Sequence, residues 1–154
     1  MAGLFFEDFE VGQKFEHVIR RTVTQTDNIL FSTMTHNPAP LHIDVEYMRT
    51  KSEFGRPLIN SFFTLGLIVG ISINDTTLGT TVANLGLEHV RFPSPLFEGD
   101  TVHAETEVIA LRRSRSRPHN GIVTLEHRGY NQHDVLVATC QRAALMLTRE
   151  HAES

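Results

Sequence analysis

Residues 59–73 read INSFFTLGLIVGISI and form the longest apolar stretch of this 154-residue chain. On a helical projection the apolar residues cover almost every side, which predicts a buried helix rather than an amphipathic surface helix. Gly66 and Gly70 leave a smooth face that a sheet could approach closely. The stretch is too short, and too often interrupted by polar residues, to span a bilayer. We therefore expect one long buried helix at the centre of the fold.

Segments with the character of β-strands follow this helix. They are rich in β-branched residues, are separated by turn residues, and cover residues 81–92, 101–112, 121–130 and 135–147. Residues 14–24 predict another strand before the helix. Early helices followed by consecutive strands are typical of the α+β class with an antiparallel sheet. The expected architecture is a single domain, residues 1–154, in which about five strands wrap around one long helix.

Residues 37–44 read NPAPLHID and connect two predicted short helices. The first helix is expected to begin after the N-cap Thr24, and the second after the N-cap Asp44. Pro38 and Pro40 fix their own φ and restrict the residues before them. The segment is therefore predicted to be an ordered loop.

Such loops, held on a rigid scaffold, often bear binding or catalytic groups. His42 is the strongest candidate acid or base because imidazole titrates near neutral pH. Asn37 cannot take a proton, but its amide can hold a water molecule or a carbonyl oxygen. His36 is a weaker alternative to His42, and Asp44 is favoured as a helix cap over a role in orienting the histidine. A structural turn, whose histidine only bonds a backbone carbonyl, explains these residues equally well.

Asn60 and Ser61 stand where the long helix is expected to begin. Either side chain can cap the helix. The first N–H groups of a helix lack intrahelical acceptors and have partial positive charge, which suits a developing oxyanion. Capping and stabilisation of an oxyanion are compatible, so we expect both.

Composition restricts the partners and the compartment. The formal charge of −4 and the isoelectric point near 6.1 argue against nucleic acid as a partner. The single Cys140 excludes an internal disulfide and suits a reducing compartment, and the first residues lack the features of a signal peptide. We expect a cytoplasmic protein that binds neither nucleic acid nor membrane. No HxxxH or CxxC spacing indicates a metal site.

Four arginines lie within residues 112–117, next to a predicted turn. Charge runs at turns are usually solvated, and we favour this interpretation slightly. Arginine also grips phosphate groups well, so a nucleotide-bearing ligand is the alternative.

Three motifs occur in the order in which one enzyme family has them. Residues 37–44 are similar to its Asp-x-Asn-Pro-(aliphatic)-His-x-Asp segment, with His42 at the catalytic histidine and Asn37 at the catalytic aspartate. Residues 56–61 are similar to Arg-Pro-(aliphatic)-(aliphatic)-His-Gly, and residues 92–101 to Phe-x-x-Pro-(aliphatic)-x-x-Gly-Asp-Thr. The chain thus resembles the MaoC-like, or R-specific enoyl-CoA hydratase, branch of the hotdog fold.

The resemblance implies that water is added to an enoyl-CoA thioester, or removed in the reverse reaction, and that CoA is part of the substrate rather than a separate cofactor. It implies a homodimer or higher homo-oligomer with the site at the subunit junction. The catalytic residues that it implies are Asn37, His42 and Ser61. The substrate-binding residues are Pro40, Asn60, Phe62 and Arg91, with Arg91 and residues 112–117 as candidates for the CoA phosphates.

Two departures from the family pattern bear on the substrate. Asn37 replaces the catalytic aspartate, and Asn60-Ser61 replaces His-Gly, although the Ser61 N–H can still serve the oxyanion. These changes resemble the subgroup that acts on short, branched or dicarboxylic acyl groups of the mesaconyl, itaconyl or methylmalyl type. The alternatives are a hotdog thioesterase and a non-catalytic acyl-CoA-binding subunit.

Overall fold

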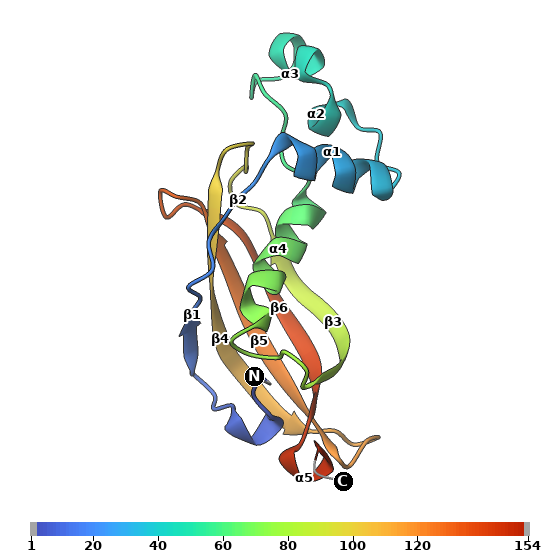
Figure 1. The fold of residues 1–154 in the computed structure, drawn as a ribbon, viewed down its shortest axis with the longest axis vertical. Helices are drawn as coiled ribbons and strands as arrows, with labels where there is room; N and C mark the ends of the chain where they lie inside the picture. Colours follow the sequence, from blue (N-terminus) through green and yellow to red (C-terminus); the bar gives the residue numbers. More distant parts are fainter. Residues whose placement is uncertain (1–2, 153–154) are drawn as a thin grey trace.

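The computed structural model describes residues 3–152. One long helix, α4 (Ser61–Ile73), lies across one face of an antiparallel sheet, and three short helices gather beyond its N-terminal end (Figure 1). The other helices are the 3-10 helix η1 (Phe6–Asp8), α1 (Gln25–Met34), α2 (Pro40–Ile43), α3 (Val45–Lys51) and α5 (Arg149–Ala152). Among the described residues, no helix has both the length and the apolar character needed to cross a membrane.

The sheet has six strands in the order β1-β4-β5-β6-β3, and β2 pairs separately with β4. Every pairing is antiparallel. The strands are β1 (Lys14–Glu16), β2 (Arg21–Thr22), β3 (Thr81–Arg91), β4 (Thr101–Arg113), β5 (Asn120–Tyr130) and β6 (Leu136–Leu147). The four long strands predicted after the helix are confirmed to within a few residues. The class and the strands wrapped around a helix are confirmed as well.

The first predicted strand, residues 14–24, is wrong in one respect, because it is two short strands. Glu16 of β1 lies opposite Glu105, whereas Arg21 of β2 lies opposite Val102, so the register against β4 changes between them. The chain bulges out in the interval, where Val18 is 88% exposed. A bulge of this kind interrupts the ladder that would make one strand.

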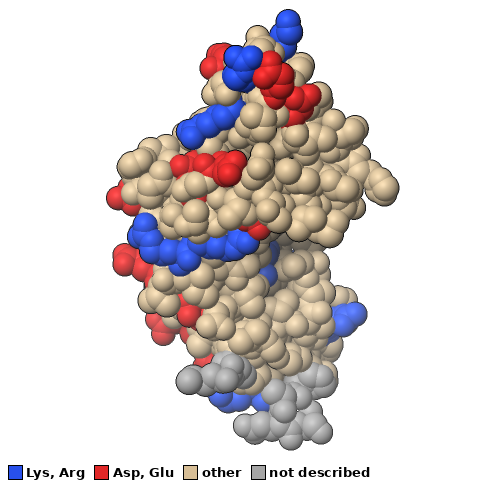
Figure 2. All heavy atoms as spheres, turned by 45° about the horizontal axis from the view of Figure 1, so that its top comes forward, with Lys and Arg blue, Asp and Glu red and all other residues tan. Residues whose placement is uncertain are grey.

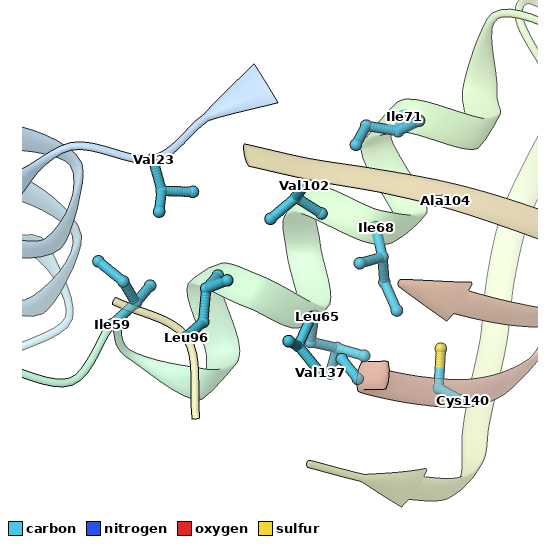
Figure 3. Packing of buried hydrophobic residues seen from close by; sticks show 11 residues of the cluster. Val23, Ile59, Leu65, Ile68, Ile71, Leu96, Val102, Ala104, Val137 and Cys140 are labelled. Atoms are coloured by element: carbon cyan, nitrogen blue, oxygen red, sulfur yellow. The ribbon is translucent and has the colours of Figure 1, made fainter. Parts of the chain in front are cut away.

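The main apolar core lies between α4 and the inner face of the sheet. In Figure 3 the side chains of Leu65, Ile68 and Ile71 leave one side of the helix and meet Val102 and Val137 of the strands. Ile68, Val102 and Val137 are at most 1% exposed. Burial of each such side chain stabilises the fold by roughly 1.5–3 kcal/mol. This packing therefore sets the position of the N-terminal end of α4 relative to the sheet.

The prediction that α4 is buried on almost every side is wrong. Phe62, at the start of the helix, is 69% exposed, and Gly66 and Gly70 are exposed. A Cβ added at either glycine would meet nothing within 4 Å, so no strand approaches this face. Periodicity could not reveal this, because the helix is apolar on its exposed side too.

Candidate functional site

The imidazole of His42 is anchored by a backbone carbonyl. His42 lies in α2 and is 9% exposed, and its Nδ1 is 2.9 Å from the carbonyl oxygen of Leu58. A carbonyl oxygen only accepts, so the hydrogen of the neutral ring must be on Nδ1. Nε2 then has a free lone pair and can act as a base. Both interpretations of this histidine are compatible, since the bond to a carbonyl also prepares the ring for proton transfer.

The loop prediction for residues 37–44 is wrong in one detail, because the segment contains the one-turn helix α2. Pro40 is the first residue of that helix, where its missing N–H costs nothing and its fixed φ is suitable. The predicted caps are confirmed on either side. The Thr24 hydroxyl accepts from the Asp27 N–H, and Asp44 Oδ1 accepts from the Tyr47 N–H at 2.8 Å.

Asn37 is placed by the C-terminal end of α1. His36 adopts a left-handed φ of 54°, and its N–H donates to the carbonyl of Thr33. The Asn37 N–H donates to the carbonyl of Ser32 at 2.8 Å. These two bonds form a Schellman motif, which ends the helix and fixes the next residue. Asn37 Oδ1 accepts from the Ala39 N–H at 3.1 Å, and the two Nδ2 donors take no part in this bond.

Asn28 joins the parts of the site, and sequence reasoning missed it. It is 2% exposed, and its Nδ2 donates to the carbonyls of His42 at 2.8 Å and Leu58 at 2.9 Å. Its Oδ1 accepts from the Asn60 N–H at 2.8 Å. One amide therefore links α1, the histidine helix and the start of α4. No local signal marked it, because α1 reads QTDNILFSTM and contains several other polar residues.

Asn60 and Ser61 stand at the start of α4, as predicted. Asn60 is 2% exposed and is the N-cap, since its Oδ1 accepts from the Phe62 N–H at 3.1 Å. Its Nδ2 donates to Ser32 Oγ at 3.2 Å, so its side chain faces the protein interior. Ser61 is the first residue of the helix, and helix geometry gives its N–H no intrahelical acceptor. This N–H is the donor that the site can offer to a ligand.

Two cavities meet the start of α4. The smaller, of about 270 Å³, includes Ser61, Leu58 and residues 92–96 in its wall. The larger, of about 490 Å³, begins at Phe62 and extends along α4 and β3. The carbonyl that accepts from His42 Nδ1 is that of Leu58, which lines the smaller cavity. His42, Asn60 and Ser61 therefore come together around one helix terminus.

Some of the predicted binding residues lie near the start of α4, and others lie far from it. Pro40 and Phe62 are exposed near the helix start, and Arg91 is exposed at the last position of β3, directly before the segment that forms part of the smaller cavity. Residues 112–117 lie in the β4–β5 hairpin, at the opposite end of the sheet from α1, α2 and α3 (Figure 1). Within one chain, this arginine run is remote from the candidate site.

Basic and acidic side chains lie near one another on the face drawn in Figure 2, and a broad area of that face has neither. Within residues 3–152, no group of three potential metal ligands comes together. The chemistry available at the site is therefore that of an imidazole, amides and a helix terminus.

Comparison with known proteins places these features in a family. The model of the MaoC like domain matches residues 8–131. The chain is 31% identical to a mesaconyl-CoA hydratase of Cereibacter sphaeroides over 98% of its length, and spans 43% of that relative. It is 29% identical to an (R)-specific enoyl-CoA hydratase of Aeromonas caviae, over 86% of this chain and 92% of the relative.

Solved structures agree on the fold. A putative MaoC domain protein dehydratase of Chloroflexus aurantiacus superimposes with a TM-score of 0.87 at 29% identity, over 96% of this chain and 41% of that one. A Mycobacterium tuberculosis protein described as having a double hotdog fold superimposes with a TM-score of 0.84 at 24% identity, over 95% and 44% of the two chains. The chain belongs to the MaoC like domain family and has its hotdog fold.

Proposed function

We propose that the chain hydrates the 2,3 double bond of an enoyl-CoA thioester, or dehydrates the corresponding hydroxyacyl-CoA. The observation that supports this most directly is the bond from His42 Nδ1 to the Leu58 carbonyl, which leaves Nε2 as a base. Leu58 lies three residues before Ser61, whose N–H begins α4. The base is thus bonded to the segment that leads into the oxyanion donor, and hydration of a conjugated thioester requires both groups.

In the proposed reaction the Ser61 N–H polarises the thioester carbonyl. His42 Nε2 takes a proton from water as the water oxygen bonds to the β-carbon, and a proton then passes from His42 to the α-carbon. The enolate-like charge that develops on the carbonyl oxygen is met by the fixed dipole of the helix. Asn37 has no carboxylate, so its Nδ2 donors hold the water while the proton transfer depends on His42.

The proposed substrates have short, branched or dicarboxylic acyl groups. The relative named mesaconyl-CoA hydratase and a beta-methylmalyl-CoA dehydratase of Chloroflexus aurantiacus, 29% identical over 96% of this chain, support this range. A thioesterase is not supported, because residues 57–73 contain no Asp or Glu that could act at the helix start. An acyl-CoA-binding subunit without activity is the remaining alternative. The replacement at Asn37 makes it credible, but the relatives named as hydratases and a dehydratase do not favour it.

The proposed enzyme is a homodimer. β3 is an edge strand, and Val82, Leu85, Leu87 and Val90 along it are each 38–51% exposed. An apolar edge with unpaired backbone groups favours pairing with a second copy. Because the larger cavity lies between α4 and this strand, such pairing would enclose it.

The decisive measurement is the loss of enoyl-thioester absorbance across a panel of short, branched and dicarboxylic enoyl-CoAs. His42→Ala should lower kcat by roughly 100-fold or more, because one group performs the proton transfer. His133→Ala, at an exposed histidine in the β5–β6 turn, is the matched control and should leave the rate unchanged. An equal rate in His42→Ala would overturn the mechanism.

The Asn37→Asp variant distinguishes a hydratase from an acyl-CoA-binding subunit without activity. One carboxylate oxygen can still accept from the Ala39 N–H, so the turn should survive. A faster reaction in this variant is expected if the scaffold is competent. CoA-ester binding without turnover, in the wild type and in Asn37→Asp alike, would show a binding subunit.

A further inference from the structure

One buried charge reaches into the larger cavity. The walls of this cavity are otherwise apolar or uncharged and come from α4 and β3: Phe62, Leu65, Gly66, Val69, and residues 84–87. Arg142, from β6, completes the wall and is 2% exposed. A guanidinium in such surroundings needs a partner, because an unpaired buried charge is strongly destabilising.

The partners of Arg142 among the described residues are all neutral. Its Nε donates to His127 Nε2 at 3.1 Å, and its Nη1 donates to Asn84 Oδ1 at 3.0 Å. Burial lowers the pKa of His127 to about 3, so this histidine is uncharged near neutral pH. The Nη2 group is buried and has no partner among residues 3–152. A guanidinium at the wall of the cavity therefore has two N–H donors that no described residue accepts.

A row of buried side chains holds the guanidinium in place. Arginine only donates, so His127 accepts at Nε2 and has its hydrogen on Nδ1, which donates to Thr106 Oγ1 at 2.9 Å. The Thr106 hydroxyl then donates to His17 Nε2 at 2.8 Å, and His17 Nδ1 donates to Asp75 at 2.8 Å. All donors point the same way along this row. The guanidinium is thus preorganised, which lowers the cost of ordering when a ligand binds.

We propose that Arg142 binds a carboxylate at the far end of the acyl group, so that the substrates are dicarboxylic enoyl-CoA thioesters. This inference rests on the proposed hydratase function and narrows its substrate class. Phe62 directly follows Ser61, the proposed donor to the thioester carbonyl, and lines the same cavity as Arg142. Arginine binds carboxylates through charge-assisted hydrogen bonds, and the apolar wall suits the carbons between the carboxylate and the thioester.

The test uses saturated thioesters that bind without being hydrated. Calorimetry should show that the full chain binds succinyl-CoA roughly ten- to a hundredfold more tightly than butyryl-CoA, the ratio expected for one charged hydrogen-bonded contact. Arg142→Met should abolish this preference and leave the affinity for butyryl-CoA intact. Arg142→Lys, which keeps the charge, should retain part of the preference. Arg49→Met, at an exposed arginine paired only with Glu46, is the matched control and should behave as the wild type.

The outcomes separate this inference from the function on which it rests. Equal affinities of the wild type for both thioesters would overturn it, even if Arg142→Met does not fold. Equal weakening of both ligands by Arg142→Met and Arg142→Lys would indicate a structural role and would also overturn it. Hydration of crotonyl-CoA but not of mesaconyl-CoA would refute the inference and leave the hydratase intact. A preference for succinyl-CoA without hydration of either enoyl-CoA would refute the hydratase instead.

Discussion

At the scale of single residues, the amide of Asn28 does the most to position the site. Its two donors bond the carbonyls of His42 and Leu58, and its oxygen accepts from Asn60. The His42 ring bonds the same Leu58 carbonyl. Displacement of Leu58 would therefore move the ring and the start of α4 together. Asn28 is a positioning residue, since it acts on the proposed reaction only through other groups.

Asn28→Ala is expected to lower kcat by more than the accompanying loss of folded protein would explain. The loss leaves two carbonyls and one buried N–H short of a partner, which costs roughly 1–3 kcal/mol of unfolding free energy. Asn28→Asp should be at least as damaging, because its carboxylate would face two carbonyl oxygens. Ser32→Ala, one turn along the same face, removes a hydroxyl that accepts from the Asn60 side chain and is the milder comparison. Nitrogen chemical shifts of His42 should show a mixed tautomer in Asn28→Ala, and an unchanged Nδ1–H tautomer would contradict the assignment.

The sequence predicted Asn37, His42, Asn60 and Ser61 because their arrangement is local. Each lies within a short motif next to a helix start or a proline, and the structure brings His42, Asn60 and Ser61 together around one helix terminus. Their catalytic and binding roles stay predictions. Asn28 and Arg142 could not be found in this way, because their partners are distant in the chain. Asn28 bonds residues 14 to 32 positions away, and Arg142 bonds Asn84 across 58 positions.

At the scale of elements, α1 faces opposite to its apolar pattern. Its buried residues are Asn28 and Ser32, whereas Leu30 is 55% exposed and Met34 is 73% exposed. A prediction based on hydrophobicity would bury the other face. The cause is local, because the polar face supplies the hydrogen bonds that α2 and α4 need. The expectation that apolar residues face the interior fails here, because the buried face of α1 holds backbone groups of α2 and of the start of α4 through hydrogen bonds.

The row of polar side chains across β4, β5 and β6 predicts how stability depends on pH. His127 is neutral in the folded protein, and its pKa falls from 6.5 to about 3 mainly through burial. In the unfolded chain the ring gains a proton as pH falls below 6.5. The unfolded state then binds more protons than the folded state. As the pH falls from 6.5 to 3, His127 therefore lowers the free energy of unfolding by up to about 1.4 kcal/mol per pH unit.

Urea unfolding of the wild type and of His127→Gln over this pH range checks that contribution. The variant should be less stable near neutral pH, because it alters the bonds to Thr106 and Arg142, but its stability should decline less steeply with acid. His133→Gln, at an exposed histidine, should keep the wild-type slope. Parallel slopes for the wild type and His127→Gln would show that the histidine accepts a proton in the folded state.

At the scale of the whole molecule, the apolar pattern of the sequence predicts only those contacts that form within one chain. The contact of α4 with the sheet follows from apolar patterning and is present. The exposed side of α4 and the apolar edge strand β3 remain unexplained by the packing of one chain. Large apolar areas of this kind on a folded protein usually mark an interface. The sequence pattern that overestimated the burial of α4 is the pattern expected if a second copy covers it.

Pairing along β3 gives a test that does not depend on activity. Leu85, 51% exposed in this strand, is the position to change. The wild type should have twice the mass of the 17.4 kDa chain by light scattering after gel filtration, and Leu85→Lys should shift it toward the mass of one chain because a lysine on each copy would meet at the paired edges. Val18→Lys, at a residue 88% exposed between β1 and β2 at the other edge, should stay dimeric. A dimer that tolerates Leu85→Lys but not Val18→Lys would place the interface on the β1 side and leave the larger cavity open to solvent.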